Sequence, residues 1–164
     1  MRLPTPRHTH YCRPRAGGIV VTPDGTTAYV VLTGTASIVP INLATGAPGT
    51  GIRISGVPDA IAVTPDGTTV YVTDLNSNTV LPIDVTTNTT GTPIPVDNTP
   101  HRIAITPDDK TAYIVNTGNN TVTLNRRGDQ YSRYSNPRRD QSTGGRGCPP
   151  MVKPSMSATT AVTP

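Results

Sequence analysis

The fold of this chain is decided by a segment that occurs three times: VTPDGTTAYV at 21–30, VTPDGTTVYV at 63–72 and ITPDDKTAYI at 105–114. The copies begin at Val21, Val63 and Ile105, so their offset is the same both times and no insertion interrupts it. The sequence between the copies repeats as well, since SIVPINLATGAPGT at 37–50 aligns with TVLPIDVTTNTTGT at 79–92. A repeat of this length predicts that one supersecondary unit is stacked several times along the chain.

Each repeat has the pattern of four short strands. In the second repeat we predict them at about 60–63, 69–73, 79–85 and 92–96. The first two are joined by Thr-Pro-Asp-Gly at 64–67, in which Pro presets φ, Asp can bond its own backbone and Gly accepts positive φ. Threonine is abundant, and Phe, Trp and Glu are absent, which favours strands over helices.

Four strands in about 40 residues form one blade of a β-propeller. The predicted fold is therefore all-β, with consecutive four-stranded antiparallel blades. Clear repeats cover 17–123, which is about two and a half copies. Known propellers close with about four to eight blades, so we expect this one to be incomplete and open.

The repeats resemble the YVTN family of β-propeller repeats. The motifs that carry the resemblance are YVVL at 29–32, YVTD at 71–74 and YIVN at 113–116, each preceded by the Thr-Pro-Asp turn. The resemblance implies a surface-layer or secreted protein for an intact relative. It says little about activity, because propellers serve many functions.

Charge divides the chain into three parts. Residues 1–16 carry four Arg and no acid, and 124–164 carry six Arg and one Lys against two Asp. Between them, 17–123 has eight Asp against Arg53, Arg102 and Lys110. We therefore predict an irregular basic flank at 1–16, blades at 17–124 and an irregular basic tail at 125–164. Because the repeats are acidic, the basic pI of the whole chain does not indicate nucleic-acid binding.

We hypothesise that both flanks are propeller sequence translated in a shifted reading frame. Read one base later, the codons of 129–138 permit Thr-Asn-Thr-Pro-Gly-Thr-Pro-Ile-Pro-Val, which nearly repeats 87–96 at the offset of the repeat. Read two bases later, 149–156 permits Pro-Asp-Gly-Lys-Thr-Val-Tyr-Val, a fourth copy of the turn in phase. The alternative is a natural basic, disordered tail.

Several motifs in the flanks resemble functional sites. His8, His10 and Cys12 would supply only three of the four ligands of a structural zinc site, so we predict no metal there. Cys12 and Cys148 could pair in an oxidising compartment, but both lie in the flanks. The single Gly-Gly-Arg-Gly tract at 144–147 is weak evidence for RNA binding.

The repeats contain candidate residues of their own. Asp24, Asp66 and Asp108 recur once per repeat, so we interpret them as turn formers on separate blades and not as catalytic carboxylates. Tyr29, Tyr71 and Tyr113 recur likewise and are expected to pack between blades with the hydroxyl near an edge. His101 has no repeating partner and stands one repeat after Asp59, so we expect it at the surface or the channel mouth.

Two classes of function remain open. The first is a non-catalytic module that binds a protein or carbohydrate ligand through its loops and channel mouth. The second is a fragment of a propeller enzyme, lactonase-like or metal-dependent, whose catalytic residues lie outside this chain. The innermost strands are almost wholly apolar, as in Ala-Ile-Ala-Val at 60–63, so we prefer the first class and predict no cofactor and no catalytic residue.

The location and partners of the chain follow only loosely from the sequence. No membrane span is apparent, and the segment 1–20 lacks the apolar core of a signal peptide. The family resemblance nevertheless favours the cell surface for an intact relative. We expect missing blades or self-association to cover the open sheet faces.

Overall fold

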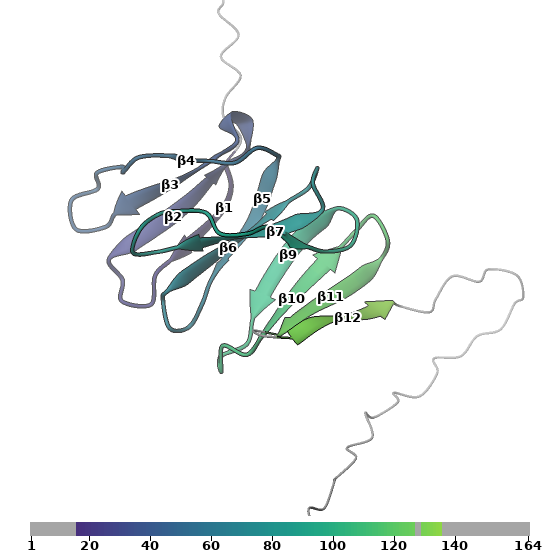
Figure 1. The fold of residues 1–164 in the computed structure, drawn as a ribbon. Coiled ribbons are helices and arrows are strands. Elements are labelled where there is room, and N and C mark those ends of the chain that lie inside the picture. The colour runs from purple at the N-terminus through teal and green to yellow at the C-terminus, as the bar shows by residue number, and fades with distance from the viewer. Residues whose placement is uncertain (1–15, 127–128, 136–164) are drawn as a thin grey trace, which may run out of the picture.

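The computed structural model describes residues 16–126 and, as backbone, 129–135. Apart from one 3-10 turn, η1 (Thr33–Thr35), every regular element in these ranges is a strand. The strands form three four-stranded antiparallel sheets that lie side by side in chain order (Figure 1). The prediction of an all-β protein with consecutive four-stranded blades is confirmed.

Each blade is a meander in which neighbours in sequence pair with each other. The first blade consists of β1 (Ala16–Val21), β2 (Thr27–Leu32), β3 (Ser37–Asn42) and β4 (Ile52–Arg53). The second consists of β5 (Pro58–Val63), β6 (Thr69–Asp74), β7 (Thr79–Asp84) and β8 (Ile94–Pro95). The third consists of β9 (Pro100–Ile105), β10 (Thr111–Asn116), β11 (Thr121–Arg126) and β12 (Asp129–Ser135).

The third blade corrects the predicted boundary of the tail. We expected irregular structure from 125 onward, but β12 pairs with β11 and completes the sheet. The described part therefore has three blades where about two and a half were predicted. β12 still departs from the repeat, because β4 and β8 follow loops at 43–51 and 85–93 whereas β12 follows β11 almost directly. The remaining parts of both predicted flanks, 1–15 and 136–164, lie outside the described residues.

Two hydrogen bonds to the Asp recur in the Thr-Pro-Asp turns of all three blades. In the first, the Thr22 hydroxyl donates to Asp24 at 2.5 Å and the Thr26 amide donates to the same carboxylate at 3.0 Å. The glycine that follows has positive φ, 70° at Gly25 and 72° at Gly67. The third turn has Asp109 there at φ 58°, a conformation that Asp tolerates better than most residues. The interpretation of these acids as turn formers is confirmed.

The two faces of each blade play different roles. The trailing face, which meets the next blade, is formed in the first blade by Val20, Tyr29, Val31, Ile38 and Pro40. The leading face, which meets the preceding blade, is formed there by Ile19, Val21, Ala28, Val30, Val39 and Ile41. The main core joins the trailing face of the first blade to the leading face of the second, and its members are Tyr29, Val31, Ile38, Ile54, Ile61, Val70, Val72 and Ile83.

Burial along the repeat reveals which faces are open. On the trailing face, Tyr29 is 1% exposed, but Tyr113 at the same position of the third blade is 41% exposed. On the leading face the order is reversed, since Ile61 is 9% exposed and Ile19 of the first blade is 65% exposed. Among the described residues, therefore, no blade precedes the first and none follows the third. This is the open, incomplete propeller that the sequence predicts.

Candidate functional site

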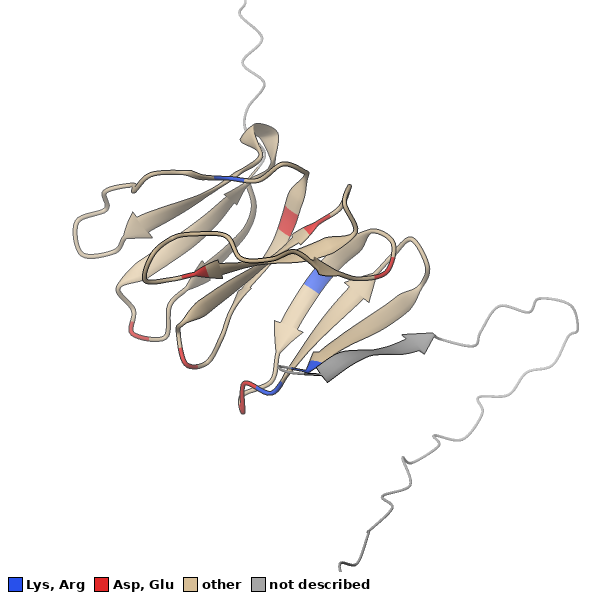
Figure 2. Cartoon of the chain, viewed as in Figure 1, with Lys and Arg blue, Asp and Glu red and all other residues tan. Residues whose placement is uncertain are grey.

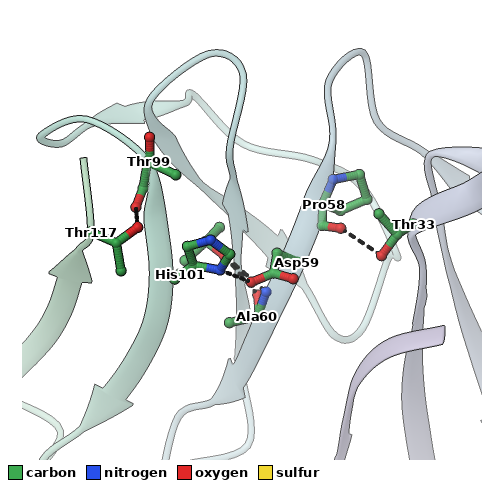
Figure 3. Close-up of polar contacts among 8 residues, drawn as sticks. Thr33, Pro58, Asp59, Ala60, Thr99, His101 and Thr117 are labelled. Atoms are coloured by element: carbon green, nitrogen blue, oxygen red, sulfur yellow. Dashed lines mark hydrogen bonds and ion pairs between the residues drawn. The ribbon is translucent and has the colours of Figure 1, made fainter. Parts of the chain in front are cut away.

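The strongest candidate site lies at the start of the innermost strands. His101 on β9 and Asp59 on β5 occupy equivalent positions of neighbouring blades, and His101 Nδ1 lies 2.9 Å from Asp59 Oδ2 (Figure 3). The side chains are 41% and 24% exposed, so a ligand can reach both. Elsewhere, Figure 2 shows an acidic position at the turn between the first two strands of each blade.

The fold fixes this pair through the packing of the innermost strands. β5 and β9 contact each other along the propeller axis, so equivalent residues of the two repeats face each other across the blade border. The carboxylate orients the imidazole through Nδ1. Within the described residues, the other ring nitrogen, Nε2, makes no hydrogen bond. An imidazole held by an acid on one side and open on the other can bind a polar group or exchange a proton.

Hydroxyl groups anchor the backbone that leads into these strands. Thr33 Oγ1 donates to the Pro58 carbonyl at 2.9 Å and joins the first blade to the second. Thr117 Oγ1 donates to the Thr99 carbonyl at 3.2 Å in the third blade (Figure 3). These bonds hold the residues just before Asp59 and His101, so they stiffen the rim on which the pair lies.

Asp74 stabilises the same end of the second blade. Its Oδ1 accepts hydrogen bonds from the amides of Val57 at 2.9 Å and Asn76 at 3.0 Å. Burial acts to raise the pKa of this carboxyl, but hydrogen bonds from Ser77, Val57 and Asn76 outweigh it and the pKa lies below its usual value. Gly56 lies so close that an added Cβ would overlap the Asp74 carboxylate. Asp74 therefore has a structural role.

The repeating turn acids are committed to their own turns. Hydrogen bonds from Thr22 and then Thr26 lower the pKa of Asp24, and hydrogen bonds from Thr106 and then Lys110 lower the pKa of Asp108. They lie at the opposite end of the strands from the rim, because β1 ends and β2 begins at this turn. None of them belongs to the Asp59–His101 site.

A second hollow lies at that opposite end. It is an open groove of about 390 Å³ between the 43–51 loop of the first blade and the 85–93 loop of the second. Tyr29 lies in its wall and donates its hydroxyl to Asn88 Oδ1 at 2.8 Å. This confirms the predicted packing of Tyr29 between blades, with its hydroxyl at an edge. Among the described residues that line the groove, no acid or base accompanies this phenol, so the groove offers binding surface rather than acid–base chemistry.

The candidates in the flanks cannot be placed. His8, His10, Cys12, Cys148 and the 144–147 tract all lie outside the described residues. Among the residues that are described, no group of three or more His, Cys, Asp or Glu could hold a metal ion. In the same ranges no helix is long and apolar enough to cross a membrane.

The sequence predicted His101 at the surface or the channel mouth, and its side chain is indeed partly exposed at the start of β9, but its partner was not predicted. A usable indication was present, since Asp59 and His101 are one repeat apart and therefore occupy equivalent positions on adjacent blades. Their contact follows from the same repeat that predicts the fold. The groove at Tyr29 had no such indication, because it depends on the path of two long loops.

Comparisons with known proteins support the fold. Similar structures include hydrazine synthase from Kuenenia stuttgartiensis, at 29% identity and a TM-score of 0.68 over 76% of this chain. Virginiamycin B lyase from Staphylococcus aureus matches 83% at 17% identity and a TM-score of 0.66. A proposed 6-phosphogluconolactonase from Bacteroides fragilis matches 72% at 17% identity and a TM-score of 0.63. No family model and no curated protein sequence matches.

These neighbours are β-propeller-like proteins, so the chain is part of a β-propeller. It spans 37% of the hydrazine synthase chain, 44% of the lyase chain and 37% of the proposed lactonase chain. Enzymes occur among proteins of this fold, so the fold alone does not separate a binding module from part of an enzyme.

Proposed function

We propose that this chain is a non-catalytic β-propeller module that binds a protein ligand at the rim formed by Asp59 and His101. The observation that carries the proposal is the partly exposed pair at the start of the otherwise mostly apolar innermost strands β5 and β9. The pair offers one acceptor and one ring nitrogen to a ligand. Protein is preferred as the ligand class because polar groups at the edge of a less polar surface are typical of protein–protein interfaces, and Thr33 and Thr117 hold the backbone beside the pair.

The location belongs to the same proposal. The resemblance of YVTD at 71–74 and its repeats to the YVTN family supports a place at the cell surface or outside the cell. A surface module would present its rim to partner proteins while the blades act as a rigid scaffold.

Binding can be tested with the full chain immobilised and proteins from the surface of the source cells passed over it. His101→Ala and Asp59→Asn should each lower retention of a bound protein at least about ten-fold, because each removes one side of the site. Leu43→Lys, in an exposed loop away from the rim, is the matched control and should retain the ligand. Retention of polysaccharide instead of protein would replace the proposed ligand class.

A part of an enzyme is the second candidate, and the geometry of His101 supports it. An imidazole held by a carboxylate at Nδ1 is a suitable general base. One structure of the similar lyase is described as catalytically inactive, carries a histidine-to-alanine replacement and contains quinupristin. Loss of quinupristin on incubation with this chain, abolished by His101→Ala, would favour the enzyme and overturn the binding module.

A further inference from the structure

The chain forms the same blade-to-blade junction twice. In the first junction Val31 of the trailing face and Ile61 of the leading face belong to one buried cluster. β1 and β2 both contact β5 there, and in the second junction β5 and β6 both contact β9. The two junctions use positions that differ by one repeat length, so they share one arrangement, although Thr73 stands in the second where Val31 stands in the first.

The two faces needed for a third junction are also present, but they lie at opposite ends of the described structure: the trailing face of the third blade and the leading face of the first. Val115 is the equivalent of Val31 and is 40% exposed, while Ile19 is the equivalent of Ile61 and is 65% exposed. Around Val115 the open trailing face carries Ala104, Tyr113, Val122 and Leu124. Around Ile19 the open leading face carries Val21, Val30, Val39 and Ile41. Both patches are apolar at the places where the internal junctions are apolar.

We propose that the open trailing face of one chain packs on the open leading face of a second copy, so that two chains close a six-bladed ring. A head-to-tail junction of this kind closes when a two-fold axis relates the copies, because each copy then uses both of its faces. Six blades lie within the known range of about four to eight.

The rest of this chain cannot supply a whole blade to cover either face. The segments 1–15 and 136–164 are each shorter than one repeat, which runs from Val21 to Ala62 in the first copy. A second copy, in contrast, brings a complete complementary face. Inside the chain Ile61 of the leading face packs with Val31, and Ile19 is the residue equivalent to Ile61 on the open leading face. The occupant is thus specified by the repeat itself.

The experiment measures the mass of the full chain in solution by sedimentation equilibrium. We expect twice the chain mass of 17.2 kDa. Ile19→Lys or Val115→Glu should each raise the dimer dissociation constant at least about thirty-fold, since each places a charge in both junctions of the ring. The two substitutions together in one chain should restore the dimer, because Lys and Glu then face each other. Arg53→Glu, on the outer strand β4, is the control and should leave the mass unchanged, because the equivalent residue Pro95 stays exposed in the second blade, which has a neighbour on each side.

Circular dichroism separates loss of association from loss of folding, because Ile19 and Val115 are exposed and their replacement removes little burial within one chain. A native chain that is monomeric at micromolar concentration, or forms aggregates of no fixed size, would overturn the proposal. So would a dimer that survives Ile19→Lys, or a double variant that stays monomeric while each single variant is folded.

Discussion

The hydroxyl of Tyr29 donates to Asn88 Oδ1 at 2.8 Å, which links β2 of the first blade to the 85–93 loop of the second. The same hydroxyl lies 3.4 Å from the Val85 carbonyl. Asn88 can reach this position because its backbone is left-handed, with φ 55°. One side chain thus connects two blades at the border where the main core lies.

Tyr29→Phe should lower the free energy of unfolding by about 1 kcal/mol, the usual net value of one hydrogen bond, because Asn88 is exposed and water can replace the phenol. Tyr71→Phe is the matched control. Within the described residues the Tyr71 hydroxyl makes no hydrogen bond, so its loss should cost less than about 0.5 kcal/mol. Urea titrations of both variants provide the measurement, and equal losses would show that the Asn88 contact contributes nothing.

Most of the fold could be predicted from the sequence because the three copies of the repeat show the same pattern of strands and turns. The strands expected at 60–63 and 69–73 are found at Pro58–Val63 and Thr69–Asp74. The turn acids were identified because the Thr-Pro-Asp-Gly turn is determined by neighbouring residues: Pro presets φ, Asp bonds the local backbone and Gly accepts positive φ. The extent of the third blade was not predictable, because β12 follows no repeat and depends on pairing with β11.

Of the candidate site, the position of His101 could be predicted from the sequence, but its contact with Asp59 could not. His101 could be assigned to the surface or the channel mouth because it has no repeating partner at the start of an innermost strand, and its side chain is 41% exposed. Its contact with Asp59 requires that the two strands approach each other at the same height, which only the assembled blades fix. Where blades stack in sequence order, polar residues one repeat length apart are therefore candidates for contact between neighbouring blades.

Gly25→Ala tests the cost of left-handed backbone in the Thr-Pro-Asp turn. At Gly25, φ is 70° and an added Cβ would meet no atom within 4 Å, so the penalty is purely conformational. We expect a loss of about 1 kcal/mol in the free energy of unfolding. Gly25→Asn should lose less, since Asn adopts this conformation more readily. Thermal unfolding of the two variants gives the comparison, and a larger loss for Asn would contradict the backbone explanation.

Asp74 predicts how stability depends on pH. Its folded pKa lies below the usual value, so the unfolded chain takes up a proton first as the pH falls. The stabilisation is therefore complete above about pH 4, the ordinary aspartate range, and is lost as the pH drops through the folded pKa. Asp74→Asn should flatten the decline of the unfolding midpoint as the pH falls below about 4. The other carboxyls with a lowered pKa, Asp24, Asp84 and Asp108, should preserve part of the decline.

The Asp59–His101 pair should matter more for binding than for stability. Both groups are partly exposed, and ion pairs in such positions contribute about 0–1 kcal/mol. A double-mutant cycle with Asp59→Asn and His101→Gln, followed by urea unfolding at neutral pH, should give a coupling energy below about 1 kcal/mol. A coupling energy of several kcal/mol would mean that the pair is a structural clamp and not a ligand site.

The shifted-frame hypothesis can be tested by restoring the third repeat. Tyr29 of the first blade is covered by Val85 and Asn88 of the second blade. Tyr71, at the equivalent position of the second blade, is partly exposed. Replacing 124–138 with the sequence of 82–96 puts an asparagine at position 130, where the shifted frame also places one. The Tyr71 hydroxyl should then gain the hydrogen bond that Tyr29 has. We expect a higher unfolding temperature, and Tyr71→Phe should now cost about 1 kcal/mol in the restored chain.

A second restored chain with alanine at position 130 is the control and should make Tyr71→Phe neutral again. If Tyr71→Phe costs the same with and without the restored segment, the third blade does not accept the loop and outer strand of the second, and the shifted-frame hypothesis loses its structural support.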